Sequence, residues 1–319
     1  MAIAVSVVLL TYNSDLEKLK YTLNSIAMQK EIDYEVIIAD DGSKALDTQT
    51  IEKWAHQRFE EQKVKFLWNK QNQGTIKNYL GAVNLATGDY VYGISPGDYF
   101  YDEFVLRDLY RFAETNHADV CFGKPQCYIN REEKQELVRC VTPINPEFFA
   151  PEKYRQFFAT VAFFFGQFAV GATYFRKRES LQNCLKKLAG RIVYIEDEAS
   201  TFIYLLEGGK LLYYNRFVVF YESNSGISTN KNHPLAKKFK EDEDEVSRYM
   251  VSCYGRNPIV RFKWTEPHFV RFLRHPCVAM CVTVNKLCKI ACKNRKQAFG
   301  DIGNLEKIQS FEENGKEVL

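Results

Sequence analysis

The chain is predicted to adopt an α/β fold with a mostly parallel central sheet, because apolar runs of strand length alternate with helical segments. The first two runs, Val7–Leu10 and Tyr34–Ala39, are separated by a segment long enough for a helix, which is typical of a βαβ unit. Both runs stop abruptly at polar residues. In such a sheet helices cover both faces, and ligands bind beyond the carboxyl ends of the strands.

Each element follows from a local pattern. Residues Asp15–Gln29 carry a leucine and isoleucine stripe at spacings of three and four, with Ser14 or Asp15 available as the N-cap, so they are expected to form the first helix. In chain order, the other expected elements are a helix at 50–62, a strand at 64–68, a polar loop at 69–74, a helix at 75–86 that ends at Thr87-Gly88, a strand at 89–94, a helix-like segment at 99–116, a helix that begins at 196, and strands at 211–214 and 217–221.

Composition limits the classes of function. With 319 residues and 46% hydrophobic content, the chain can bury one large core and a smaller accessory region. A net charge of +3 gives no indication of a nucleic-acid partner. The nine cysteines, odd in number and irregularly spaced, indicate thiols of a reduced cytoplasmic protein rather than a disulfide framework.

No targeting or membrane-spanning segment is expected. Met1–Val5 enters the first strand directly, without a basic segment or a cleavage site. The apolar run Cys277–Val284 is too short to span a bilayer. The protein is therefore expected in the cytoplasm, either soluble or attached peripherally to the inner face of the cell membrane.

Two acidic residues follow the second strand directly, in the segment Asp40-Asp41-Gly42-Ser43. Carboxylates accept hydrogen bonds from hydroxyl and N–H groups, so at the ligand-binding edge they suit a nucleoside better than a bare phosphate. The alternative is an ordinary Asp-Gly turn that leaves the strand.

Five segments in one order resemble the family 2 glycosyltransferases of the GT-A fold, a Rossmann-like fold used by inverting enzymes of bacterial surface-polysaccharide synthesis. The segments are 7–13, 35–43, Asn72-x-Gly74 with Asn78, 86–91, and Ile195-Glu196-Asp197. The resemblance extends over residues 3–225, about two thirds of the chain. It implies a nucleotide-sugar-binding catalytic domain.

The resemblance implies that a nucleotide-sugar donor, a UDP-sugar, binds at the edge of the sheet. Thr11 and Tyr12 match positions that contact the base and the ribose, and Asp41 matches a carboxylate that accepts a hydrogen bond from uracil, with Asp40 in support. A ring for base stacking beside such a carboxylate selects a pyrimidine. Lys77 faces the diphosphate in this interpretation, and its alternative is a solvated helix lysine. The donor-binding residues implied are Thr11, Tyr12, Asn13, Asp40, Asp41, Gly74, Lys77, Asn78, Ser95 and Gly97.

The strand at 89–94 ends in Ser95-Pro96-Gly97-Asp98, where the family commonly has Asp-x-Asp or Asp-x-Asp-Asp. Those carboxylates hold the ribose and a divalent cation, Mn²⁺ or Mg²⁺, that bridges the diphosphate. Only Asp98 remains in register here, and one carboxylate can suffice because phosphate oxygens and waters complete the octahedron. Asp98 is therefore the candidate metal ligand, and its alternative is a cap of the helix-like segment that follows.

The segment Glu196-Asp197-Glu198 is the candidate for catalysis. Inverting glycosyl transfer needs a base that takes the proton from the acceptor hydroxyl. The resemblance makes Asp197 this base, with Glu196 orienting the acceptor or a loop. The alternative is an acidic first turn of a helix, which the helix dipole favours.

Two further segments concern the acceptor and the diphosphate. A phenylalanine-rich stretch at 157–168 predicts core packing, with a sugar-binding or lipid-facing surface as the alternative. The loop Glu222–Thr229, rich in small polar residues, is a candidate lid over the diphosphate. Its alternative is an ordinary surface loop.

Residues 231–319 are expected to form a helical, basic C-terminal region beside a catalytic domain at 1–230. Between residues 261 and 296 nine Lys or Arg side chains accompany a single acid, Glu266. Mixed with aromatic and aliphatic residues, they indicate an amphipathic surface that lies on an anionic bilayer. The alternatives are a basic helical pair packed on the catalytic domain and a contact between copies in a homo-oligomer.

These observations predict an inverting glycosyltransferase that moves a sugar from a UDP-sugar to a saccharide or lipid-linked glycan in surface polysaccharide synthesis. A sugar-nucleotide nucleotidyltransferase would carry a Gly-rich, basic phosphate loop after the first strand, and the sequence has none there. The alternative that stays open is a non-catalytic relative that only binds nucleotide or glycan, because the acidic strand end is degraded.

Overall fold

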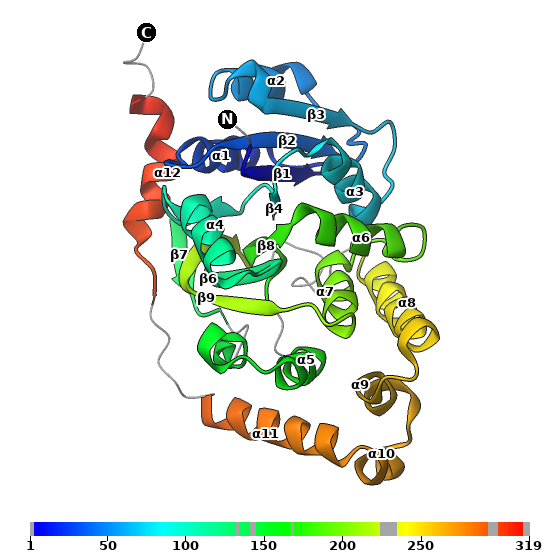
Figure 1. The fold of residues 1–319 in the computed structure, drawn as a ribbon. Coiled ribbons are helices and arrows are strands. Elements are labelled where there is room, and N and C mark those ends of the chain that lie inside the picture. The colour runs from blue at the N-terminus through cyan, green and yellow to red at the C-terminus, as the bar shows by residue number, and fades with distance from the viewer. Residues whose placement is uncertain are drawn as a thin grey trace.

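The structure is a computed structural model that describes residues 3–131, 134–140, 145–166, 169–223, 235–292 and 299–314. Within these ranges the strands of one sheet are β1 (Val5–Thr11), β2 (Tyr34–Asp40), β3 (Val64–Trp68), β4 (Tyr90–Ile94), β5 (Tyr99–Phe100), β6 (Val120–Arg131), β7 (Lys134–Val138), β8 (Tyr174–Lys177) and β9 (Leu211–Glu222). Their order is β3-β2-β1-β4-β8-β6-β9-β5, with β7 paired to β6. Figure 1 shows this sheet through the middle of the molecule with helices on either side.

The parallel sheet predicted from the sequence is confirmed for the first four strands. β3, β2, β1 and β4 are all parallel neighbours, so their carboxyl ends meet at one edge. The other half of the sheet is mixed: β8 runs antiparallel to β4 and β6, whereas β9 runs parallel to β6. The α/β architecture is thus as expected, with a second half that contains both parallel and antiparallel strand pairs.

Helices cover both faces of the sheet because its strands are apolar on both faces. The helices up to residue 206 are α1 (Leu16–Ala27), α2 (Thr48–His56), α3 (Thr75–Leu85), α4 (Val105–Asn116), α5 (Gln156–Phe164), α6 (Arg178–Leu188) and α7 (Glu196–Leu206). On one face α1, α2 and α4 bury their apolar stripes, and on the other face α3, α5, α6 and α7 do so. The Asp15 carboxylate accepts a hydrogen bond from the Lys18 N–H at 3.1 Å, which confirms the predicted cap of α1.

Three expected elements differ from the structure because of non-local contacts. The helix predicted at 50–62 ends at His56, where Arg58 turns back to bond Asn24 across the fold. The segment 99–116 is not one helix: Tyr99 and Phe100 form β5 against β9, and α4 begins only at Val105. Asp98 is therefore not the cap of a helix that starts at residue 99.

The two strands predicted at 211–214 and 217–221 are a single strand, β9. The polar residues Asn215 and Arg216, which suggested a break, are exposed where the register of β9 against β6 shifts. A bulge of this kind leaves residues unpaired without ending the strand.

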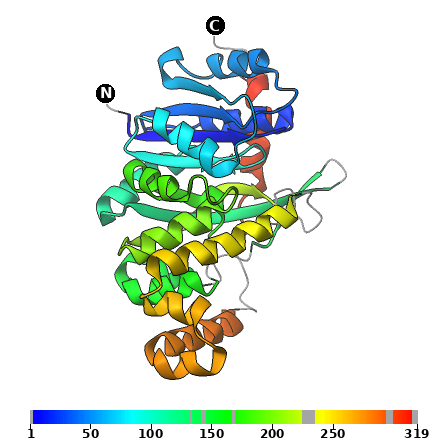
Figure 2. The same cartoon turned by 90° about the vertical axis from the view of Figure 1, so that its right-hand side faces the viewer.

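The C-terminal region is helical, as predicted, but its helices pack in different places. They are α8 (Ala236–Tyr254), α9 (Pro258–Val260), the π-helical turn η5 (Arg261–Thr265), α10 (His268–Arg274), α11 (Pro276–Cys292) and α12 (Ile302–Asn314). In Figures 1 and 2, α10 and α11 lie at the end of the molecule opposite α2, whereas α12 returns to α1. The Asn24 amide donates to the Ile308 carbonyl at 3.2 Å. The division at residue 230 stays a prediction.

α8 and α11 join the main core. Val246, Tyr249 and Met250 of α8 are buried on the face that α7 covers. The side chains of Asn285 and Lys289 on α11 donate to the Phe165 carbonyl at 3.3 and 3.0 Å. None of the described helices is long and apolar enough to cross a membrane.

The phenylalanine-rich stretch contributes mainly to the core, as predicted first. Phe163 and Phe164 are buried, whereas Phe157 and Phe158 are partly exposed. Gln167 and Phe168 lie outside the described residues.

One pair of cysteines corrects the expectation that all nine are free thiols. Cys127 and Cys140 form a disulfide, with Cα atoms 5.3 Å apart. Cys127 faces Val138 across the β6–β7 ladder, which brings Cys140 within reach. This pairing depends on a hairpin register that the cysteine spacing does not reveal.

A buried glutamate ties the start of the sheet together. Glu35 on β2 accepts hydrogen bonds from the Ser6 hydroxyl at 2.7 Å and the Thr87 N–H at 2.6 Å, and pairs with the Lys65 ammonium at 2.7 Å. Burial acts to raise the pKa of Glu35, but these partners lower it overall below its usual value. Glu35 therefore stabilises the fold in its ionised form.

We expect Glu35→Gln to lower the free energy of unfolding at neutral pH by about 2 kcal/mol, since it weakens two hydrogen bonds and an ion pair of a buried group. The difference from wild type is fully present above pH 4.5, the usual pKa of the group, and is lost as the pH falls through the lower pKa of the folded protein. Urea unfolding from acid to neutral pH measures it. The control is Glu61→Gln, at an exposed position. Its free energy of unfolding should equal that of wild type across the same pH range.

Candidate functional site

The carboxyl ends of β1 and β2 hold the predicted donor residues together. Thr11 and Asp40 are register partners, and the Asp41 N–H donates to the Thr11 carbonyl at 2.9 Å. The Asp41 carboxylate accepts hydrogen bonds from the Gln73 and Gly74 N–H groups, both at 2.8 Å. Asp41 thereby fixes the loop before α3 against the end of β2. Burial, together with the charge of Asp40, raises the pKa of Asp41.

Asp40 and Asn13 shape the adjoining turn. The Asp40 carboxylate accepts hydrogen bonds from the Ser43 N–H at 2.7 Å and the Ser43 hydroxyl at 2.5 Å. The Asn13 N–H donates to the Ser43 hydroxyl oxygen at 2.6 Å, with Asn13 in the left-handed conformation at φ 46°. These bonds leave Tyr12 41% exposed at the edge of the sheet. Its ring is open to a ligand.

Gly74 joins this edge to the segment before α7. Its φ of 87° favours glycine, and a Cβ there would lie 2.1 Å from Val193 Cγ1. The Ile76 N–H donates to the Val193 carbonyl at 3.1 Å. The loop that binds Asp41 therefore lies directly against the segment that leads to Glu196.

Asn78 and Lys77 differ in their surroundings. The Asn78 amide is buried, donating to the Ala39 carbonyl at 3.0 Å and accepting from Asn69 at 2.9 Å. It supports β2. Lys77 is exposed on α3, and its contact with a diphosphate stays a prediction.

The segment Ser95-Pro96-Gly97-Asp98, which follows β4 and lacks most of the family's carboxylates, turns at Gly97. Gly97 has a φ of 98°. Its N–H donates to the Thr22 hydroxyl oxygen at 3.3 Å, and its carbonyl accepts from the Tyr128 hydroxyl at 2.5 Å. The neighbouring Asp98 is 8% exposed, and its carboxylate accepts from the Glu222 N–H at 3.2 Å. Ser95 is exposed beside them.

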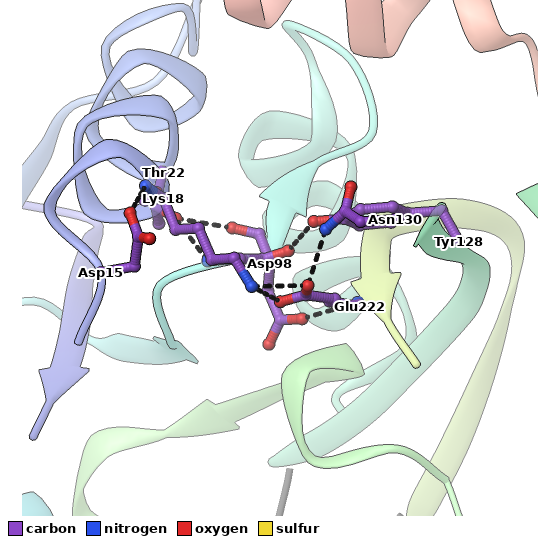
Figure 3. Close-up of polar contacts among 8 residues, drawn as sticks. Asp15, Lys18, Thr22, Asp98, Tyr128, Asn130 and Glu222 are labelled. Carbon is purple, nitrogen blue, oxygen red and sulfur yellow. Dashed lines mark hydrogen bonds and ion pairs between the residues drawn. The ribbon is translucent and has the colours of Figure 1, made fainter. Parts of the chain in front are cut away.

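An ion pair that the sequence did not indicate lies at this strand end. The Lys18 ammonium on α1 donates to both carboxylate oxygens of Glu222, at 2.6 and 2.8 Å, and the Asn130 amide donates to the same carboxylate at 2.7 Å. Figure 3 shows Lys18, Asp98, Asn130 and Glu222 converging from α1, the β4 end, β6 and β9. We call these four residues the Lys18 cluster. Burial, with the charge of Glu222, raises the pKa of Asp98 to about 8.

The Lys18 cluster does not fit a divalent cation well. Hard cations prefer several accessible oxygens, whereas Asp98 is buried and Glu222 is already bonded to an ammonium. Among the described residues no group of three or more His, Cys, Asp or Glu side chains could hold a metal. Asp98 as a metal ligand stays a prediction that this arrangement disfavours.

The acidic segment begins α7 at Glu196, which confirms the predicted helix start. The Asp197 carboxylate accepts a hydrogen bond from the Glu198 N–H at 2.7 Å. Its other oxygen, Oδ2, lies 3.1 Å from where a Cβ on Gly171 would stand. Gly171 thus leaves room in front of the carboxylate.

Burial sets the protonation of the acid pair. It raises the pKa of Glu196 to about 8, assisted by the charge of Asp197, and it also raises the pKa of Asp197. The buried guanidinium of Arg176 opposes both shifts. At neutral pH Glu196 therefore holds a proton. Environments that set the protonation of two neighbouring acids are typical of acid–base sites.

A buried aspartate of the C-terminal region positions the segment before α7. Asp242 on α8 is 1% exposed and accepts hydrogen bonds from the Val193 N–H at 2.9 Å and the Tyr194 N–H at 2.6 Å. Tyr194 itself was not predicted as a site residue. Burial and the nearby charges of Asp242 and Asp41 raise its pKa.

A cavity of about 320 Å³ lies beside the acidic segment. Its lining includes Glu198 and Phe202 of α7, Lys240 and Glu243 of α8, and Lys263 and Trp264 of η5. The Lys263 ammonium lies 4.9 Å from the ring centres of both Phe202 and Trp264. Burial lowers the pKa of Lys263 to about 8 and raises that of Glu198 to about 7.

The candidate lid lies mostly outside the described residues, since 224–229 are not among them. Sequence reasoning located the acids at the strand ends and at α7. It missed Lys18, Glu222, Asp242 and Tyr194, whose partners are distant in the chain. The only signal in the sequence that could have identified them as site residues is that each is a polar residue next to an apolar run.

Residues 6–179, more than half of the chain, match the family model described as glycosyl transferase family 2. The chain belongs to glycosyl transferase family 2. This confirms the predicted family and the predicted enzyme class, a glycosyltransferase.

Individual relatives agree with this family. The poly(ribitol-phosphate) beta-N-acetylglucosaminyltransferase TarP of Staphylococcus aureus is 31% identical over 126 residues, which are 38% of this chain and 36% of TarP. The aligned part thus spans about a third of that relative.

Two solved structures share the fold of this chain. Residues 1–349 of S. aureus TarS in complex with UDP-GlcNAc superpose with a TM-score of 0.60 at 16% identity, covering 98% of this chain and 92% of that fragment. The match covers 55% of the longer solved TarS chain. The mannosyltransferase PcManGT of Pyrobaculum calidifontis, in complex with GDP-Man and Mn²⁺, gives 0.55 at 12% identity, covering 100% and 82%. These likenesses confirm the predicted GT-A fold.

We expect Asp242→Ala to lower the free energy of unfolding by about 1–3 kcal/mol, because it leaves two buried N–H groups without an acceptor. Amide hydrogen exchange at Val193 and Tyr194 should become faster than in wild type. The exposed Asp244→Ala on the same helix is the control. Unchanged exchange at both amides would show that Asp242 does not hold this segment.

Proposed function

We propose that this glycosyltransferase moves a sugar from a UDP-sugar, with inversion, to a hydroxyl group of a surface polymer or its lipid-linked precursor. The observation that carries the proposal is the contact between Gly74 and Val193. It supports a single site, because the loop that Asp41 binds lies against the segment that leads to Glu196 and Asp197.

The donor end suits a pyrimidine nucleotide. Tyr12 offers an exposed ring, and Asp41, held by two backbone N–H groups, offers the remaining lone pairs of its carboxylate to a base N–H. TarS binds UDP-GlcNAc, according to its structure. UDP-GlcNAc is therefore the first donor to test.

Asp197 acts as the base. As the acceptor oxygen attacks the anomeric carbon, its proton passes to the Asp197 carboxylate, and the bond from the anomeric carbon to the diphosphate oxygen breaks. The nucleoside diphosphate leaves with that electron pair. Asp197 is the better base of the acid pair at neutral pH because burial holds the proton on Glu196.

The acceptor binds in the cavity beside α7. Trp264 provides a ring face for a sugar or alditol, and Glu198, Lys240 and Lys263 provide polar groups around it. The two lysines also suit an acceptor that carries phosphate. TarP acts on poly(ribitol-phosphate), by its name, so this polymer is the first acceptor to test.

We expect Asp197→Asn to lower kcat with UDP-GlcNAc and poly(ribitol-phosphate) by about 10²- to 10⁴-fold. Glu196→Gln should stay within about tenfold of wild type at neutral pH, because the amide resembles the protonated carboxyl group. The wild-type rate should rise as Asp197 ionises and fall as Glu196 loses its proton near pH 8. The variant Glu196→Gln should lack the alkaline fall.

Both variants should bind UDP as wild type does, which separates catalysis from donor binding. Full turnover by Asp197→Asn would assign the base elsewhere. If wild type turns over no nucleotide sugar with any polymer, the non-catalytic alternative holds.

The proposal includes contact with a membrane through α10 and α11. Among the described residues, seven exposed large apolar side chains lie on these two helices: Phe269, Phe272, Leu273, Met280, Val284, Leu287 and Ile290. Arg274 and Lys286 are exposed on the same two helices. An apolar face flanked by cations suits an anionic bilayer, where a lipid-linked acceptor would lie.

We expect the protein to sediment with vesicles that contain phosphatidylglycerol, and less with pure phosphatidylcholine. Leu273→Ser with Ile290→Ser should reduce this binding severalfold, because both side chains are exposed apolar anchors. Leu85→Ser, at a partly exposed site on α3, is the control. If wild type ignores vesicles but self-associates through this face in ultracentrifugation, the homo-oligomer alternative holds.

A further inference from the structure

The Lys18 cluster lies where the resemblance places the family's metal-binding carboxylates. Those positions are Ser95, Gly97 and Asp98 in this chain, and only Asp98 is an acid. A Cβ on Gly97 would lie 2.5 Å from Glu222 Oε2 and 3.6 Å from Lys18 Cδ. A side chain at position 97 is therefore excluded, and the space belongs to a carboxylate and an ammonium from β9 and α1.

The two charges are arranged with the cation toward solvent. The Lys18 side chain is 33% exposed, whereas the Glu222 side chain behind it is 9% exposed. Asn130 and the Asp98 segment fix Glu222 from the other side, through its carboxylate and its N–H. Of the two charged side chains that Figure 3 shows in contact, that of Lys18 is therefore the more accessible to a ligand at the strand end.

We propose that the Lys18 ammonium, held by Glu222, binds the diphosphate of the nucleotide-sugar donor in place of a divalent cation. This inference rests on the proposed function. A fixed cation at the leaving diphosphate stabilises the charge that develops there, as a metal would, and needs no reorganisation during the reaction. Donor binding by this chain is then independent of metal.

The charges of the Lys18 cluster favour binding of a diphosphate by Lys18 over binding of a divalent cation. Lys18 and Glu222 neutralise each other, so a divalent cation at Gly97 would have to displace an ammonium from two hydrogen bonds of 2.6 and 2.8 Å. An anionic diphosphate needs no such displacement, because the exposed face of the ammonium still has an N–H to donate.

The test is calorimetric titration of UDP and of uridine into the full chain in EDTA, repeated with Mn²⁺. Wild type should bind UDP in EDTA, with an affinity that Mn²⁺ changes by less than about twofold. Lys18→Met should weaken UDP about tenfold to a hundredfold, the loss expected for a hydrogen bond to a charged group. Uridine, which has no phosphate, should bind both proteins equally.

Lys20→Met is the matched control, since Lys20 lies two residues further along α1, over the Trp54 ring, and its substitution should leave UDP binding unchanged. Because Lys18→Met leaves Glu222 without its cation, the double variant Lys18→Met with Glu222→Gln keeps the shape without the charges. It should fold as wild type in thermal unfolding and show the same loss of UDP affinity.

Three results would overturn the inference, each in a different way. UDP binding that Mn²⁺ strengthens more than about tenfold, with uridine bound normally, refutes the lysine but leaves the donor site standing. No binding of either UDP or uridine refutes the uridine-nucleotide site itself, and the inference with it. Unchanged UDP affinity in the folded double variant also refutes the role of Lys18.

Discussion

Two buried carboxylates, Asp41 and Asp242, hold the parts of this site in one place. Asp41 binds the backbone of the loop before α3, and Asp242 binds the backbone before α7. Between them Gly74 lies against Val193 with no room for a side chain. A carboxylate that accepts two N–H groups has a fixed direction. The distance between the edge at Asp41 and the acid pair at Glu196-Asp197 is therefore set by backbone segments that these two carboxylates hold in place.

Buried carboxyl groups also occur in the two acidic parts of the site, at the start of α7 and at the end of β4, and their charges are compensated differently in each. At α7 burial separates two neighbouring acids so that one carries the proton, with Arg176 as the buried cation. At the β4 end, the acid of β9 is neutralised by a lysine that reaches solvent. Buried acids are costly unless paired, and here each pairing leaves one group of defined charge facing the surface.

Much of this arrangement could be read from the sequence where the signal is local. Strand runs that end in acids predicted the sheet edge, and a polar start to an apolar helix predicted α7, because both depend on neighbouring residues. The Lys18–Glu222 pair joins residues 204 positions apart, and Asp242 lies 48 positions from Tyr194. Such pairs depend on the order of strands in the sheet, which no local pattern contains. β5 was mistaken for helix for the same reason, since its partner is β9.

The return of α12 to α1 has a consequence for how the chain acquires its shape. Leu305 and Ile308 bury Tyr99 and Tyr128, and the Tyr128 hydroxyl holds Gly97. The partners Asn24 and Ile308 are 284 positions apart. Since a chain is synthesised from its N-terminus and folds as it emerges, the corner at Asp41, which is proposed to bind the base, can form while translation continues. The corner at Gly97 can form only after β9 and α12 have been synthesised. A nascent chain on the ribosome therefore has only part of this edge of the sheet folded.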